Sequence, residues 1–195
     1  MEEHLSKVFY IIVFCLVTFP AFGLEKCNFE LVPEFFKIAV NFYTEDEKLE
    51  QKGYFEDITL KGGLFGNSIR DIVKNMEVFI PFNKLNTYNT TRDRIIYNHL
   101  VSLDTKKKGN FHIKVLDLGK KRVKLRVKIG TLSKDLTFKY DSRDVSMQSI
   151  GYIDLADFKM VSVKKQLEEK YNQKIWNDIF IDIRAKFNKN CKEEL

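Results

Sequence analysis

The sequence predicts a mainly β protein: an antiparallel barrel of about eight strands with one amphipathic helix in its C-terminal half. The clearest observation is the segment 122–129, where Arg and Lys alternate with aliphatic residues without a break. Only an extended strand keeps Val123, Leu125 and Val127 on one side, because its side chains alternate between two faces. The same alternation recurs along the chain. Short turn sequences such as Lys61-Gly62-Gly63 connect these segments, which favours antiparallel hairpins over parallel crossovers.

Period-two patterns place the strands in order along the chain. The predicted strands are 36–43, 54–60, 76–82, 111–115, 122–129, 136–140, 149–155 and 179–187. A sheet of this many strands can close on itself and remove its exposed edges.

Two segments follow helical spacing instead. Residues 68–74 resemble a short helical turn, and in 157–173 the apolar residues recur every three or four positions. This second segment predicts one amphipathic helix. It either covers an open end of the barrel or lies on an apolar patch outside, and the second arrangement is the default expectation.

The first 23 residues are interpreted as an export signal. The apolar run 8–19 is too short to span a bilayer, and Ala21-Phe22-Gly23 has the small-x-small form of a cleavage site. The alternative is an uncleaved membrane anchor, because Glu2 and Glu3 weaken the positive start expected of a signal. The remaining residues, 24–195, are predicted to form a single domain in the periplasm.

Two cysteines remain beyond the signal, Cys27 near the start of the domain and Cys191 near its end. In an oxidising compartment an even pair predicts a disulfide that ties the termini together. Two free structural thiols are the alternative.

Little in the sequence indicates an enzyme. The domain has only two histidines, His99 and His112, and neither has a Cys or carboxylate at metal-ligand spacing, so no metal site is expected. The glycines of 62–66 lack the Lys-Ser/Thr of a phosphate loop. The net charge of +6 suits an anionic surface or simple solubility, and nucleic acid is not expected as a partner of an exported chain.

Three short motifs occur in the order found in the YceI-like family of exported proteins. They are Val78–Thr87 followed by Arg92-Asp93, then Gly151–Phe158, then Trp176–Ile179. The chain resembles this family over most of residues 24–195. The resemblance implies a lipocalin-like barrel whose interior holds an isoprenoid or another amphiphilic chain, and therefore binding or transport without catalysis.

Inward positions on the clearest strands are the candidate ligand contacts: Phe36, Ile38, Phe42, Ile80, Phe138 and Ile181. Arg92 and Asp93 follow a polar stretch suited to a turn, and we expect a structural role in which they fix a loop by hydrogen bonds to backbone groups. No cofactor is expected other than a bound isoprenoid or similar lipid.

The alternative function is a solid-cored interaction domain. Its cationic strand face, with Arg122 and Lys124, would bind an acidic partner or an anionic membrane surface. A row of like charges on a wet strand face is more often solvated surface. A transient membrane contact and a homodimer stay open as further alternatives.

Overall fold

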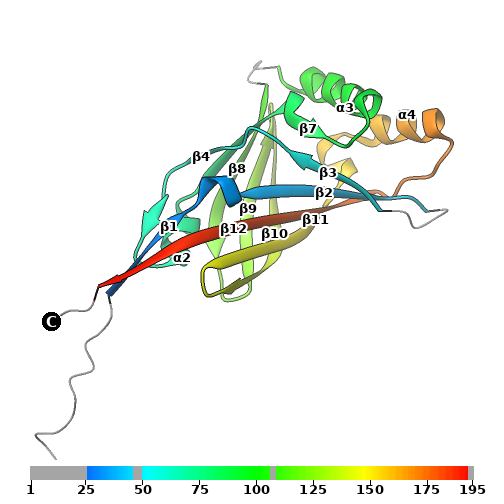
Figure 1. Cartoon of the computed structure of the whole chain (residues 1–195). Coiled ribbons are helices and arrows are strands. Elements are labelled where there is room, and N and C mark those ends of the chain that lie inside the picture. The colour runs from blue at the N-terminus through cyan, green and yellow to red at the C-terminus, as the bar shows by residue number, and fades with distance from the viewer. Residues whose placement is uncertain (1–25, 46–49, 106–108, 193–195) are drawn as a thin grey trace, which may run out of the picture. The chain divides into compact units, whose positions relative to one another are not determined.

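The computed structural model describes residues 26–45, 50–105 and 109–192 (Figure 1). Within these ranges the chain is mainly β. The strands are β1 Lys26–Leu31, β2 Lys37–Tyr43, β3 Glu50–Phe55, β4 Thr59–Lys61, β5 Phe65–Gly66, β6 Glu77–Pro81, β7 Leu85–Asn86, β8 Asn110–Leu118, β9 Arg122–Ile129, β10 Leu132–Arg143, β11 Ser146–Asp154 and β12 Asp178–Lys192. The helices are α2 Ile69–Lys74, α3 Thr90–Leu103 and α4 Val161–Tyr171, with 3-10 turns η1 Pro33–Phe35, η2 Phe82–Lys84 and η3 Leu155–Phe158.

One antiparallel sheet contains these strands, in the order β4-β6-β8-β9-β10-β11-β12-β2-β3-β7, with β1 beside β12 and β5 beside β1. The two ends of this order approach each other. The residues just after β3, near one end of the order, lead within a few positions into β4, at the other end. The ring of Phe55 on β3 lies edge-on to that of Phe111 on β8, with centroids 5.4 Å apart. The sheet is therefore curled into a half-barrel around an apolar interior.

Alternation along the strands sets which residues face this interior. On β9 the side chains of Val123, Leu125, Val127 and Ile129 are at most 5% exposed, while Arg122, Lys124 and Lys128 are exposed. On β8 a bulge between Val115 and Asp117 shifts the alternation and brings Leu118 inward. The predicted antiparallel β fold is confirmed.

The sheet has more strands than the eight predicted, because several are only two or three residues long. The eight predicted segments correspond to β2, β3, β6 and β8–β12, but the segment 54–60 was wrongly taken as one strand. The chain turns at Asp57, whose φ of 52° lies in the left-handed region. This turn sends β3 and β4 toward opposite ends of the strand order.

Helices cover the two ends of the half-barrel. Figure 1 shows α3 and α4 together at one end and α2 at the other. The predicted helical turn at 68–74 is confirmed as α2, where the Ser68 hydroxyl caps the helix by accepting from the Asp71 N–H at 3.1 Å. The helix α3 was not predicted. Its only fully buried residues are Ile96 and Leu100, so its apolar stripe is too narrow to stand out in the sequence.

The chain divides into two compact units, Asn28–Asn190 and the two chain ends through Cys27 and from Cys191. The predicted disulfide is present between Cys27 and Cys191. The predicted signal segment, residues 1–23, lies outside the described residues. Among the helices that the structure describes, none is long and apolar enough to cross a membrane.

We predict that replacing both Cys27 and Cys191 by Ser lowers the free energy of unfolding. The bridge joins residues 164 positions apart. The chain-entropy model assigns closure of so long a loop about 4–5 kcal/mol, as an upper value. Urea denaturation of the oxidised wild type and the double Ser variant measures the difference. Equal midpoints and slopes would contradict a stabilising role.

Candidate functional site: an apolar cavity under two helices

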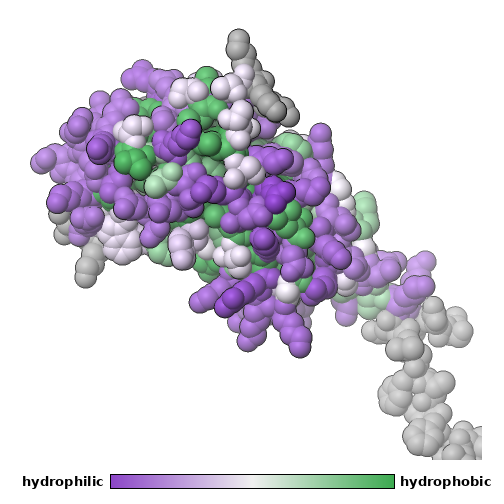
Figure 2. Space-filling view, turned by 180° about the vertical axis from the view of Figure 1, so that it is seen from behind, coloured by the Kyte–Doolittle hydropathy of each residue, from purple (hydrophilic) through white to green (hydrophobic). Residues whose placement is uncertain are grey.

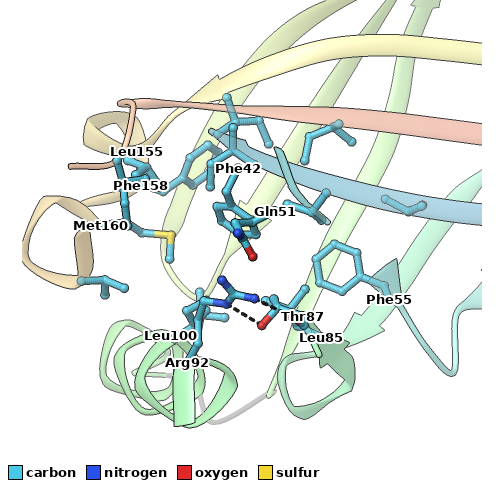
Figure 3. Close-up of a pocket in the computed structure, with 18 of the residues that line it drawn as sticks. Phe42, Gln51, Phe55, Leu85, Thr87, Arg92, Leu100, Leu155, Phe158 and Met160 are labelled. Atoms are coloured by element: carbon cyan, nitrogen blue, oxygen red, sulfur yellow. Dashed lines mark hydrogen bonds between the residues drawn. The ribbon is translucent and has the colours of Figure 1, made fainter. Parts of the chain in front are cut away.

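The interior of the half-barrel contains a cavity of about 590 Å³. Its walls are mostly aliphatic and aromatic side chains from the curled sheet and from the helices that cover it. In Figure 3 the side chains of η3, α3 and β7 converge on it from the helical end, while Phe42 and Phe55 face it from β2 and β3. The cavity belongs wholly to the unit Asn28–Asn190.

Five of the six residues predicted as ligand contacts line this cavity: Ile38, Phe42, Ile80, Phe138 and Ile181. The sixth, Phe36, does not line the cavity. It is buried, 6% exposed, and faces the same interior, but it lies beyond the cavity in the packed region. Phe36 lies just before β2 and two residues beyond Ile38, which borders both the cavity and the packed region. Alternation predicts which side chains face inward, but it does not predict where along the strand the cavity ends.

The amphipathic helix predicted at 157–173 is present as α4, preceded by η3. Its predicted apolar face, Met160, Val163, Leu167 and Tyr171, lines the cavity. The default expectation that this helix lies on the outside is therefore wrong. It covers the end of the half-barrel together with α3, whose Arg92, Ile96 and Leu100 also line the cavity.

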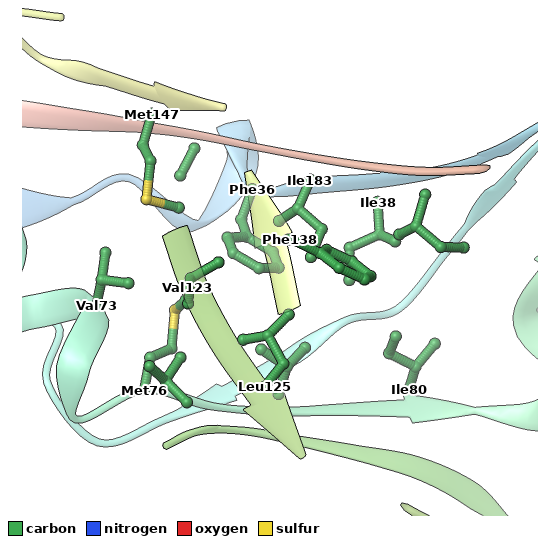
Figure 4. Packing of buried hydrophobic residues seen from close by; sticks show 14 of the residues in the cluster. Phe36, Ile38, Val73, Met76, Ile80, Val123, Leu125, Phe138, Met147 and Ile183 are labelled. Carbon is green, nitrogen blue, oxygen red and sulfur yellow. The ribbon is translucent and has the colours of Figure 1, made fainter. Parts of the chain in front are cut away.

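The other end of the interior is filled by side chains. Figure 4 shows Phe36, Val73, Met76, Val123 and Met147 packed closely there. Only about 30 Å³ of space remains among these residues. The cavity is thus closed at the α2 end.

Polar residues collect at the opposite end of the cavity, where β3, the start of α3 and the end of α4 meet. We call this region the mouth, defined by Gln51, Lys52, Tyr88, Asn89 and Gln173. Tyr88 is 76% exposed and Lys52 is also exposed, so the cavity opens to solvent here. The Tyr171 hydroxyl donates to the Asn89 side-chain oxygen at 3.0 Å and joins α4 to the first turn of α3.

Arg92 and Asp93 both bind Thr87, a residue that is 1% exposed. The Arg92 Nε donates to the Thr87 hydroxyl oxygen at 2.7 Å, and Nη2 donates to the Thr87 carbonyl (Figure 3). The Asp93 carboxylate accepts from the Thr87 hydroxyl and from its backbone N–H at 3.1 Å. The three residues fix the strand β7 to the start of α3. Arg92 and Asp93 lie in the first turn of α3, and their hydrogen bonds to the Thr87 backbone fix the loop between β7 and α3, which is the structural role that we expected.

The surroundings of Arg92 affect its titration. Burial lowers the pKa of the Arg92 guanidinium, although the neighbouring Asp93 opposes this change. An arginine remains protonated at neutral pH despite such a shift. Arg92 therefore places a permanent positive charge beside the apolar cavity.

Thr44 is a second polar residue in the cavity wall. Its side chain is 3% exposed, and its hydroxyl has no hydrogen-bond partner among the described residues. A buried hydroxyl without a partner is costly and therefore unusual in native structures. Thr44 follows β2 and pairs with Ile175 across an isolated bridge, close to the end of α4.

No cluster of metal-binding side chains is present in the ranges that the structure describes. His112 lies on the outer face of β8 and binds Glu77 at 2.8 Å. His99 contacts the Lys159 carbonyl oxygen. The cationic row on β9 is partly neutralised, because Asp135 forms ion pairs with Arg126 at 2.7 Å and Lys124 at 3.5 Å. These pairs hold the pKa of the Asp135 carboxyl below its usual value.

We predict that Asp93→Ala destabilises the protein. The substitution leaves the buried Thr87 N–H and hydroxyl without their acceptor, which costs about 1–3 kcal/mol. Thermal and urea unfolding measure the loss. Arg94→Ala is the matched control, because Arg94 is on the same helical turn but exposed, and its change should stay within about 0.5 kcal/mol. Unchanged unfolding of the Asp93 variant would contradict a structural role.

Comparisons with known proteins identify the fold. No family profile and no curated protein sequence matches the chain. A polyisoprenoid-binding domain from Saccharophagus degradans, implicated in plant cell wall breakdown, superposes with a TM-score of 0.56 at 12% identity and covers 85% of this chain and 99% of that one. BcnA from Burkholderia cenocepacia superposes with a TM-score of 0.49 at 10% identity, and the match covers 78% of this chain and 96% of BcnA. The YceI protein from Campylobacter jejuni superposes with a TM-score of 0.47 at 20% identity, and the match covers 74% of this chain and 86% of that protein. The chain has the fold of the polyisoprenoid-binding domain.

Proposed function

We propose that this protein binds one amphiphilic chain, an isoprenoid or a similar lipid, and sequesters or carries it without chemical change. The single observation that supports this function is the apolar cavity of about 590 Å³ inside the half-barrel. Its volume lies in the range of roughly 300–1,000 Å³ that is typical of small-molecule sites. The fold neighbour from Saccharophagus degradans is described as a polyisoprenoid-binding domain, which favours the same class of ligand.

Apolar contact would supply most of the affinity. Burial of hydrocarbon contributes roughly 25 cal/mol per Å², from which the cost of ordering the chain is subtracted. The polar groups near the mouth would hold the head of the ligand. Thr44 is suited to this role, because its buried hydroxyl would gain the hydrogen bond that it lacks within the described residues. The ligand is therefore proposed to enter tail first, with its polar head near Thr44.

The alternative of a solid-cored interaction domain has less support. The helical half of the interior contains a cavity, and part of the cationic row on β9 is paired with Asp135. Figure 2 shows hydrophilic side chains over most of the face seen from behind, with hydrophobic residues in small separate groups. A steep loss of partner binding with added salt would favour this alternative over lipid binding.

We propose a periplasmic location for the protein. The disulfide between Cys27 and Cys191 supports an oxidising compartment. The signal-like start of the sequence supports export. Binding is proposed in preference to catalysis, because the partly buried Arg92 and the buried Thr87 of the cavity wall are engaged in hydrogen bonds that fix α3 to the segment after β7.

We predict that organic-solvent extraction of the purified protein releases a lipid, and that the delipidated protein takes up geranylgeraniol. Val40→Trp should abolish both, because Val40 is 4% exposed and lines the cavity, so an indole there occupies the ligand space. Mass spectrometry of the extract and of the reloaded complex measures occupancy. Asn41→Trp is the control, since the next residue of β2 faces the other side of the sheet. An extract without lipid, together with no uptake by the wild type, would contradict lipid binding.

We predict opposite effects of Thr44→Val on stability and on binding. The valine has nearly the same shape and removes a buried hydroxyl without a partner, so the ligand-free protein should be equally or more stable. Affinity for geranylgeraniol should fall about 5- to 10-fold, as expected for one lost hydrogen bond. Thermal unfolding and a binding titration measure the two quantities. Unchanged affinity would contradict the placement of the head near Thr44.

A further inference from the structure

The end of the cavity can be located on several of the strands that surround it. On β6, Ile80 lines the cavity while Val78 lies in the packed region; on β9, Leu125 borders both regions while Val123 belongs to the packed region alone. The residues that border both regions are Ile38, Ile113, Leu125 and Ile183. They define a boundary layer across the half-barrel, between an apolar cavity and a filled core.

Phe138 lies next to this boundary layer, on the cavity side. Its side chain is 2% exposed, lines the cavity and belongs to the packed core cluster. Figure 4 shows its ring between Ile183 and Ile38, on the side of the core that leads to the cavity. On β9 its neighbour in register is Val123, the first residue beyond the cavity. The Phe138 ring is therefore the largest side chain at the closed end of the cavity.

The ring is held in this place by a close approach to Gly151. Phe138 and Gly151 lie beside the paired residues Lys139 and Ile150 of β10 and β11. A Cβ atom at position 151 would lie 2.0 Å from Phe138 Cδ1 and 2.3 Å from Cγ, so only glycine leaves room for the ring. The aromatic ring covers the glycine backbone, a cross-strand arrangement that also appears in designed sheets.

The volume of the cavity between Phe138 and the mouth limits the length of the isoprenoid chain that fits. If each non-hydrogen atom takes roughly 30 Å³, the share of a water molecule in its liquid, a cavity of about 590 Å³ holds about twenty such atoms. An isoprenoid of about four units has this size. A longer chain has to leave its remainder outside the mouth, where it gains little from burial.

We propose that Phe138, seated on Gly151, is the floor of the cavity and sets the length of the isoprenoid chain that the protein selects. This inference rests on the proposed function and adds a specificity-determining residue to it. With the native floor, affinity rises with each added isoprene unit until the chain reaches the ring, and then stops rising.

The test is a set of binding titrations with geraniol, farnesol, geranylgeraniol and geranylfarnesol, each one unit longer than the one before. For the delipidated wild type, each added unit should improve Kd at least about tenfold up to geranylgeraniol, because every buried methylene contributes. The step to geranylfarnesol should change Kd by less than about threefold, since the added unit remains outside the cavity.

Two substitutions should change, in opposite directions, the chain length at which affinity stops rising; we call this length the limit. Phe138→Ala removes a ring of about the size of one isoprene unit and opens the small space beyond it, so geranylfarnesol should bind at least about tenfold more tightly than geranylgeraniol. Gly151→Ala should push the ring into the cavity, because the packed side has only about 30 Å³ free. Affinity should then stop rising at farnesol.

Two further variants keep the test informative. Truncation of a core Phe to Ala is strongly destabilising, so Phe138→Leu serves as a milder enlargement if the Ala variant does not fold. Phe42→Ala enlarges the cavity nearer the mouth and should weaken all four alcohols while the limit stays at geranylgeraniol. Circular dichroism and thermal unfolding establish that each variant is folded.

The outcomes separate this inference from the proposed function. Binding of all alcohols with a limit that moves with Phe138 and Gly151 supports both. Binding with a limit that stays at geranylgeraniol in every variant, or with no limit at all, overturns the role of Phe138 and leaves lipid binding intact. Failure of the wild type to bind any of the four alcohols overturns both.

Discussion

The inward side chains of the curled sheet have to be kept from water at both ends of the half-barrel, and the rest of the structure depends on how this is done. At one end the solution is close packing: α2 and residues such as Phe36 and Met147 fill the interior. At the other end α3 and α4 cover the sheet without filling it. The same inward face is therefore a solid core in one half and the wall of a cavity in the other.

Polar contacts hold the covering helices in place and so link the local structure to the proposed function. Thr87 accepts from Arg92 and donates to Asp93, which fixes α3 to β7, while the Tyr171 hydroxyl joins α4 to the cap of α3. These contacts join residues that also line the cavity, because Thr87, Asn89, Arg92 and Tyr171 all belong to its wall. The Arg-Asp pair thus helps to hold α3 in its place over the cavity.

Alternation predicted the sheet well because a strand with one dry face has to repeat every second residue. It placed Ile38, Ile80 and Ile181 correctly on the inward face. It gave no measure of depth, which is why Phe36 was assigned to the cavity. The helix α3 was not predicted, because its only signals in the sequence are the capping residue Asn89 and a narrow apolar stripe. The close contact of Phe138 with Gly151 depends on the pairing of β10 with β11, which a single sequence does not contain.

A crystal structure of the protein grown with geranylgeraniol tests the central claim most directly. The account predicts one chain inside the half-barrel, with its tail against the ring of Phe138 and its hydroxyl within hydrogen-bond distance of Thr44. The contrary result would be an interior filled by rearranged side chains, with the alcohol absent or bound only to the outer surface. That result would show that the cavity is not a binding site.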